Sequence, residues 1–161
     1  MNDREERPPR ARRRFEPRAE GPPPDAFETA VRLLALRPHS AVELRRKLRQ
    51  RGCPEERIDA AIARAQELGY QSDVDFAASL VRTRSTSRGR LAMAADLARR
   101  GVDREAAGDA LAGVTPEDEL TTARAIAARM PSIEAGRLGG RLQRRGFSSE
   151  VVRRVVRERR G

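Results

Sequence analysis

The chain has 161 residues, a formal net charge of +10 and 38% apolar residues, with four Phe, one Tyr and no Trp. Small apolar side chains bury little area each, so this composition argues against one large globular core and favours a thin helical assembly. A single cysteine excludes an internal disulfide framework, and no apolar run is long enough to cross a membrane. We therefore expect a monomeric protein of the cytoplasm that has no membrane partner.

The basic excess favours a polyanion or an acidic protein surface as the partner. Arginine supplies 33 of the 34 basic residues, and a bias in coding composition explains that preference equally well. Such a bias explains the net charge less well, because the 24 acidic residues do not balance it.

Residues 1–24 are rich in proline and arginine and almost free of apolar side chains, which is typical of a disordered tail. From Asp25 onward the apolar spacing is helical, and no segment alternates as a strand would. Asp25 is expected to cap a first helix, which ends before Arg37 and Pro38 because a proline disfavours helical geometry in the preceding residue.

Two further helices complete a first unit over residues 25–70. Ser40 is predicted to cap the second helix, with Glu43 at the spacing of a capping box, and the helix ends at Gly52. Pro54 is predicted to open the third helix at a position where its missing N–H costs nothing.

A second unit is predicted over residues 71–113. Asp73 is expected to cap its first helix, and residues 85–89 are expected to form a mobile loop. The buried side of the next helix, which ends at Gly101, is formed either by one set of residues or by another: Leu91, Ala94 and Leu97, or Met93 and Leu97. Asp103 is expected to cap a short third helix.

A third unit is predicted over residues 114–161. Thr115 is expected to cap its first helix, with Pro116 at the first helical position, and either Ser148 or Ser149 to cap the last helix. Three glycines would each cost about 1 kcal/mol inside the middle helix, which predicts the weakest packing for this unit: Gly136, Gly139 and Gly140.

A leucine, basic residues and a glycine recur in the same order at the end of each middle helix. The glycines Gly52, Gly101 and Gly146 are 49 and 45 residues apart, a period typical of tandem helical arrays. They are predicted to be left-handed caps. The sequence therefore predicts an all-α protein, an elongated curved array of three tandem three-helix repeats that resemble helix-turn-helix units.

Basic residues gather at the end of each middle helix and around the 85–89 loop. Guanidinium groups suit bidentate binding of phosphates or carboxylates, although cations at a helix C-terminus also favour the helix dipole. Recurrence in three units favours a shared electropositive stripe, and the lack of interleaved aromatic residues disfavours base stacking. The contact candidates are Arg45, Arg46, Lys47, Arg49, Arg51, Arg82, Arg84, Arg88, Arg90, Arg99, Arg100, Arg141, Arg144 and Arg145.

The sequence offers little for catalysis. His39 is the sole histidine and stands at a helix start, where a turn residue is the expected role. No Cys/His cluster suits zinc, no glycine-rich loop follows a strand, and Cys53 is expected to be a structural thiol. We expect no enzyme activity, no metal and no cofactor.

The first unit and the start of the second carry a linked set of motifs: Arg37-Pro38-His39-Ser40, Glu43-Leu44, Leu48, Arg51-Gly52, Leu68-Gly69-Tyr70, Asp73, Asp75, Phe76 and Ala77. The chain resembles the RecX family of recombination regulators in these residues, and residues 97–102 and 144–148 are similar to its second and third units. The chain departs from the family pattern at Gln71 and Ser72, where the family usually has an apolar residue and an acid.

The resemblance extends over residues 26–158 and implies three tandem three-helix units. It also implies a regulator, without catalysis of its own, that binds the RecA nucleoprotein filament. Family members commonly inhibit the ATPase, strand-exchange and coprotease activities of RecA in DNA repair and the SOS response, and some bind DNA. Two alternatives stay open: a stand-alone DNA-binding module of helix-turn-helix type, on single- or double-stranded DNA, and an adaptor for an acidic protein.

Overall fold

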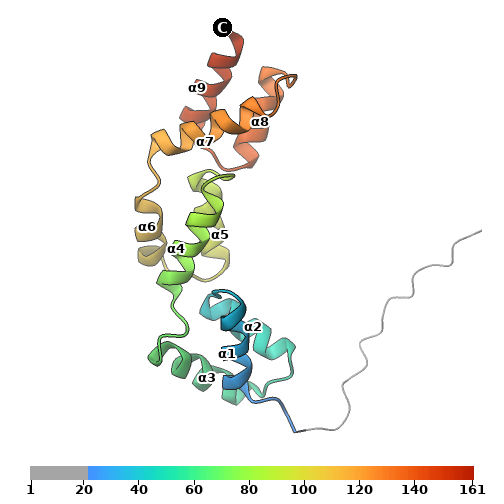
Figure 1. Ribbon diagram of the computed structural model, residues 1–161, viewed down its shortest axis with the longest axis vertical. Coiled ribbons are helices and arrows are strands. Elements are labelled where there is room, and N and C mark those ends of the chain that lie inside the picture. Colours follow the sequence, from blue (N-terminus) through green and yellow to red (C-terminus); the bar gives the residue numbers. More distant parts are fainter. Residues whose placement is uncertain (1–21) are drawn as a thin grey trace, which may run out of the picture.

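The computed structural model describes residues 22–161, so the prediction of a disordered tail over residues 1–24 lies almost entirely outside the described part. Within that part the chain forms helices only and is elongated and curved, as predicted (Figure 1). The helices are α1 (Ala26–Leu36), α2 (Ala41–Gln50), α3 (Glu55–Glu67), α4 (Asp73–Arg84), α5 (Arg90–Arg99), α6 (Arg104–Ala112), α7 (Pro116–Ala128), α8 (Ala135–Arg144) and α9 (Ser149–Arg160).

Each set of three consecutive helices encloses its own apolar core, and we refer to these sets as the first, second and third units. The first core contains Leu44, Leu48 and Ile58, all fully buried. The second core is built around Met93 and Leu97. The third core takes residues from all three of its helices: Leu120, Ala123, Leu138, Leu142, Phe147, Val151, Val152 and Val155. The division of the chain at residues 70/71 and 113/114 stays a prediction.

The three glycine caps are confirmed. Gly52, Gly101 and Gly146 have φ angles of 78°, 75° and 80°, in the left-handed region that favours glycine. After each glycine, the next amide N–H donates back to the leucine carbonyl five residues earlier, at N···O distances of 3.2, 3.1 and 3.3 Å. This is the closing bond of a Schellman motif, and the residue that donates it is buried in each case: Cys53, Val102 and Phe147.

In the first unit, Asp25 and Ser40 cap α1 and α2 as predicted, accepting bonds from Glu28 N at 2.7 Å and Glu43 N at 3.1 Å. The capping box predicted for Glu43 is wrong, because the Glu43 carboxylate turns toward side chains outside α2. Pro54 is the N-cap of α3 instead of its first helical residue.

In the second unit, the cap predicted for α4 is wrong by one residue. Ser72 Oγ accepts from Asp75 N at 3.1 Å, while Asp73 Oδ1 accepts from Ala41 N of the first unit at 2.8 Å. Of the two alternatives for α5, Met93 and Leu97 form the buried side, while Leu91 is 61% exposed.

The loop predicted at residues 85–89 is confirmed, and its mobility stays a prediction. Arg88 N donates to Arg84 O at 2.9 Å, and Thr122 Oγ1 donates to Ser85 O at 3.2 Å. These bonds tie the loop both to the end of its own helix α4 and to α7 of the next unit.

In the third unit, Thr115 and Asp118 form a reciprocal capping box, and Ser148 caps α9. The three glycines do lie inside α8, and Gly139 is buried. A Cβ atom at Gly139 would lie 3.3 Å from Val156 Cγ2, so the glycine lets α8 and α9 approach closely. Leu138, Leu142 and Phe147 are nonetheless buried, and the third core is fully formed.

The middle helices α2, α5 and α8 follow one another along the length of the molecule (Figure 1). In the first junction, between the first and second units, Ser40 Oγ donates to Arg100 O at 2.7 Å. In the second junction, between the second and third units, Gly89 N donates to Arg145 O at 2.9 Å. In both, the C-terminal end of one middle helix meets the N-terminal end of the previous one, so their dipoles run head to tail.

Candidate functional site

Half of the predicted contact candidates are used inside the protein. Four pair with carboxylates: Arg45 Nε lies 3.0 Å from Asp59 Oδ1, Arg49 Nε lies 2.8 Å from Glu55 Oε2, and Arg84 and Arg99 both bind Asp96. The side-chain hydrogen bond between Arg49 and Glu55 raises the pKa of the arginine and lowers the pKa of the glutamate.

Three more candidates have structural roles between or within units. Arg100 Nη1 binds the buried Glu43 carboxylate across the first junction, and Arg145 Nη1 donates to Ser87 O at 3.1 Å across the second. Arg90 Nη1 donates to Leu111 O, which joins α5 to the end of α6. Arg100 and Arg145 therefore link neighbouring units, and Arg90 links two helices of the second unit.

The other seven candidates form no ion pair with any residue in the range 22–161. They lie on the first unit, on the second unit around the end of α4, and on the third unit along α8, and they are at least partly exposed: Arg46, Lys47, Arg51, Arg82, Arg88, Arg141 and Arg144. These seven residues therefore form separate basic areas, one on each unit, in place of the continuous stripe that was predicted.

The third unit carries more free arginines than the sequence prediction assigned to it. Residues 114–161 contain eleven arginines and six acidic residues. This excess of five positive charges is half of the net charge of the whole chain. Two helices each present three exposed arginines at i, i+4 and i+7, the spacing of a single helix face. We name these the α8 triad and the α9 triad: Arg137, Arg141 and Arg144, and Arg153, Arg157 and Arg160.

Neither triad has an ion-pair partner among the described residues. Successive members are roughly 6 Å or less apart along the helix axis, so three cations stand in a row on a rigid support. The buried residues Leu138 and Leu142 of α8 and Val152 and Val155 of α9 lie on the opposite sides of their helices. The α9 triad was missed from the sequence, although its i, i+4, i+7 spacing was visible there.

The first junction holds a buried polar cluster around Glu43, which is 6% exposed. Besides Arg100, His39 Nδ1 lies 3.2 Å from Glu43 Oε2 and Arg37 Nη1 lies 3.3 Å from the same oxygen. Burial, followed by the positive charges of Arg37 and its neighbours, lowers the pKa of His39 to about 4. The imidazole is therefore neutral at pH 7 and serves as a buried partner in the junction.

The described part of the chain gathers no cluster of metal-ligating side chains, and its cysteine is buried. Among residues 22–161, no three His, Cys, Asp or Glu side chains gather as metal ligands would. Cys53 is buried in the first core, as expected of a structural thiol. Over the same residues, no helix has the length and apolar character needed to cross a membrane.

The fold and its surface define a class: elongated helical proteins of stacked three-helix units that carry separate basic areas along their length. The family model described as "RecX, first three-helix domain" matches residues 26–64, and that described as "RecX, second three-helix domain" matches residues 72–111. The matches span the first two units.

Curated relatives match most of the chain. Regulatory protein RecX of Stenotrophomonas maltophilia (strain R551-3) is 34% identical over 164 residues, which are 98% of this chain and 97% of the relative. Regulatory protein RecX of Thermobifida fusca (strain YX) is 38% identical over 138 residues, 80% of this chain and 75% of the relative. The chain therefore belongs to the RecX family of regulatory proteins.

Solved structures share the fold. The crystal structure of RecX from Lactobacillus salivarius superposes with a TM-score of 0.67 at 24% identity, covering 84% of this chain and 94% of that one. A second structure, described as regulatory protein RecX, gives a TM-score of 0.72 at 24% identity over 81% of this chain and 70% of that one.

Proposed function

We propose that this protein binds the RecA nucleoprotein filament in the cytoplasm and inhibits the ATPase, recombinase and coprotease activities of RecA. Membership of the RecX family carries the proposal, since relatives that match nearly the whole chain are named regulatory proteins. Because these relatives are named regulatory proteins, we propose a regulator that has no catalytic activity of its own.

The shape of the array supports a filament as the partner. The three units lie at successive positions along one axis, so each can meet a different subunit of a polymer (Figure 1). Weak contacts made by linked units add through their high effective concentration. Arg46 and Arg51 of the first unit, which have no ion-pair partner among residues 22–161, and the two triads of the third unit would then act together.

The direct test is DNA-dependent ATP hydrolysis by RecA on single-stranded DNA. We expect hydrolysis to fall with less than one molecule of this protein per RecA subunit, because each molecule would span several subunits. Unchanged hydrolysis with the protein in excess over RecA would contradict the proposal, and faster hydrolysis would show that this member stimulates RecA.

The two arginine triads favour DNA as a second contact, and the protein alone should bind it weakly. Each phosphate contact adds about 0.9 to the slope of log affinity against log salt, so removing three contacts should lower that slope by roughly 2.7. Tight, sequence-specific binding without RecA would instead support the stand-alone DNA-binding module.

The variant for both assays reverses the α8 triad: Arg137→Glu, Arg141→Glu and Arg144→Glu. The matched control reverses three exposed arginines with no ion-pair partner in the described part, one per unit: Arg57→Glu, Arg104→Glu and Arg129→Glu. The control has the same net charge, so only the location of the charge differs. Arg45 and Arg49 are poor probes, because their reversal would also break their pairs with carboxylates on α3.

A further inference from the structure

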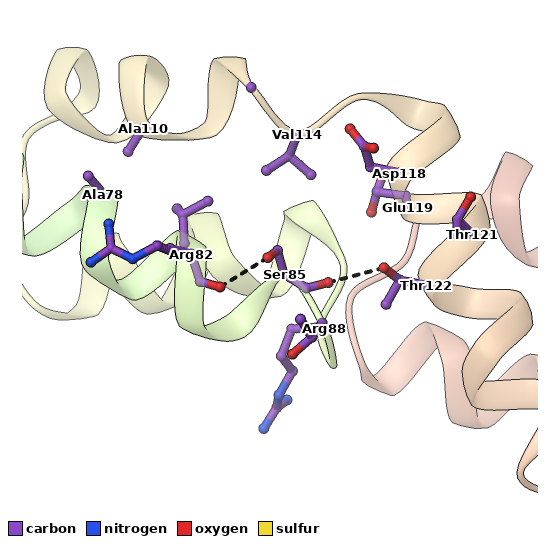
Figure 2. Close-up of a pocket in the computed structure, with 13 residues that line it drawn as sticks. Ala78, Arg82, Ser85, Arg88, Ala110, Val114, Asp118, Glu119, Thr121 and Thr122 are labelled. Atoms are coloured by element: carbon purple, nitrogen blue, oxygen red, sulfur yellow. Dashed lines mark hydrogen bonds between the residues drawn. The ribbon is translucent and has the colours of Figure 1, made fainter.

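A cavity of about 550 Å³ opens at the second junction, between the end of α4, the 85–88 loop, the end of α6 and the start of α7 (Figure 2). This volume lies within the range of sites that hold small molecules or side chains of a partner. It is separate from the α8 and α9 triads, none of whose arginines line it.

The linker beside the cavity is shorter than its counterpart at the first junction. Three residues, Gly69, Tyr70 and Gln71, separate the C-cap of α3 from the N-cap of α4, whereas Val114 alone separates the C-cap of α6 from the N-cap of α7. At the first junction, Gln71 is 3% exposed and its Nε2 donates to His39 O at 3.2 Å and to Asp73 Oδ1 at 2.7 Å.

Gln71 thus fills the space between a loop, α3 and α4 of the first junction. The counterparts of those elements at the second junction are the 85–88 loop, α6 and α7, and these line the cavity. The shortened linker provides no glutamine there, and the space stays open.

One wall of the cavity is apolar. Ala78 and Val81 of α4 face Ala110 of α6 and Val114 of the linker, as Figure 2 shows for the three of these that it labels. Ala78 is exposed, which leaves room beside it for an aliphatic side chain.

The polar groups of the cavity differ in the hydrogen bonds that they already form. Both carboxylates accept hydrogen bonds: Asp118 accepts from the Thr115 hydroxyl at 2.6 Å and from Thr115 N at 3.0 Å, which together lower its pKa, and the buried Glu119 accepts from Arg90 N at 2.8 Å. Ser85 Oγ and Thr122 Oγ1 donate to backbone carbonyls, as the dashed lines in Figure 2 show.

The two arginines that line the cavity have no carboxylate partner among the described residues. Arg82 is exposed and lies beside Ala78 on the apolar wall, while Arg88 extends from the loop on the other side of Ser85 (Figure 2). Arg82 and Arg88 are therefore the charged side chains of the cavity that form no hydrogen bond among the described residues, and Arg82 adjoins an aliphatic surface.

We propose that this cavity docks an acidic segment of a partner protein, with an aliphatic side chain against Ala78 and Val81 and an adjacent carboxylate on Arg82. Arg88 attracts the same segment without contacting its aliphatic side chain. The proposal rests on the proposed function only in taking a protein as the occupant. Arg–carboxylate pairs of this kind are charge-assisted, and the apolar contact adds the shape selection that a bare anion would lack.

The test uses the full chain without RecA and follows backbone amide shifts by NMR during titration with acetyl-Asp-Leu-Glu-Leu-Asp-amide, to about 5 mM. We expect saturable shifts at Thr86 and Gly113, and binding about tenfold weaker for the neutral acetyl-Asn-Leu-Gln-Leu-Asn-amide. Arg82→Glu should abolish the shifts, and Ala78→Leu should weaken binding by filling the apolar wall. Arg104→Glu, at the far end of α6, is the control and should bind as the original chain does.

Absence of saturable shifts, equal binding of the neutral peptide, or unchanged binding by Arg82→Glu would each overturn the proposal. Inorganic phosphate that shifts the same amides while the peptide does not would also overturn it, leaving only an anion site. Inhibition of RecA without peptide binding would contradict this proposal alone, whereas peptide binding without any effect on RecA would contradict the proposed function alone.

Discussion

The two junctions of the array make the same head-to-tail contact with different chemistry. At the first junction the contact is made by side chains: the Ser40 hydroxyl reaches the carbonyl of Arg100, and the Arg100 guanidinium returns to the buried Glu43. At the second junction it is made by backbone, because Gly89 N donates to Arg145 O at 2.9 Å and Leu91 N donates to Gly146 O at 3.1 Å.

The difference follows from the residues at equivalent positions. The N-cap of the middle helix is Ser40 in the first unit and Gly89 in the second. The third residue of the same helix is Glu43 in the first unit and Ala92 in the second. A Cβ atom on Gly89 would overlap the carbonyl of Gly146, so only glycine lets the two backbones bond directly. Where Ser40 occupies the cap, its hydroxyl and the neighbouring polar side chains make the contact instead. The geometry of the repeat is thus compatible with two chemical solutions.

The largest effect is expected from Gly146→Ala. The left-handed conformation costs an alanine roughly 1–2 kcal/mol, and its Cβ atom would overlap the backbone of Ala92, so both backbone bonds of the second junction should break. We expect a loss of about 4 kcal/mol in the free energy of unfolding, measured in urea. Gly52→Ala is the control, since the same conformation has nothing within 4 Å there and should lose only about 1–2 kcal/mol. Equal losses would show that the contact with Ala92 is unimportant.

Arg100→Ala tests whether the first junction depends on its buried charges. Removing the arginine leaves the Glu43 carboxylate buried with weaker partners, which should cost about 3 kcal/mol of unfolding free energy. Arg145→Ala, at the equivalent position of the second junction, loses one hydrogen bond to Ser87 O and should cost about 1 kcal/mol. A larger cost for Arg145→Ala would reverse the comparison.

Mild acid should weaken the first junction more than the second. The folded protein lowers the pKa of His39 to about 4, against about 6.5 in an unfolded chain, so below pH 6.5 the unfolded state binds the extra proton. The stabilisation by neutral His39 is complete above pH 6.5 and is lost as the pH falls toward 4. After allowance for solvent screening we expect a loss of about 2 kcal/mol.

The measurement is the thermal midpoint between pH 7.5 and pH 4, together with amide exchange at the two junctions. His39→Asn should flatten the pH dependence, since an amide does not titrate in this range. The second junction has Arg88 in the place of His39, so its amides should keep their protection over the same interval. Equal loss of protection at both junctions would contradict the assignment to His39.

Ser40→Ala should have the smallest effect, between about 1 and 2 kcal/mol of unfolding free energy. It removes both the N-cap bond of α2 and the bond to Arg100 O. Ser72→Ala is the matched control, because Ser72 caps α4 through Asp75 N and its hydroxyl forms no bond across a junction within residues 22–161. The difference between the two losses measures the junction bond, and a difference of zero would mean that this bond contributes nothing.

Local features were predictable because they depend on few neighbouring residues. A helix cap needs an oxygen three residues ahead of an N–H, and a left-handed turn needs a glycine, so Asp25, Thr115 and the three glycine caps were found correctly. Asp73 shows the limit. A carboxylate at a helix start accepts from whichever free N–H lies nearest, and for Asp73 that N–H belongs to Ala41 in another unit.

The basic residues show the same limit at the level of the site. The sequence does not distinguish an arginine that faces solvent, such as Arg141, from one that bridges two units, such as Arg100 or Arg145. Periodicity separates some of these cases, since the α8 and α9 triads keep to one helix face. It could not show that Arg45 and Arg49 would meet carboxylates on α3, because that depends on how α2 and α3 pack.

The sequence by itself determined the helices, their glycine ends and the recurrence of three units, since these follow from short-range sterics and from apolar spacing. Only the tertiary structure decided how the units join, which arginines remain free and where a cavity opens. Those properties depend on contacts between residues far apart in the chain, such as Ser40 with Arg100 and Gly89 with Arg145. One such contact can be made by a hydroxyl or by a backbone amide, and the choice becomes visible only when both partners are in place.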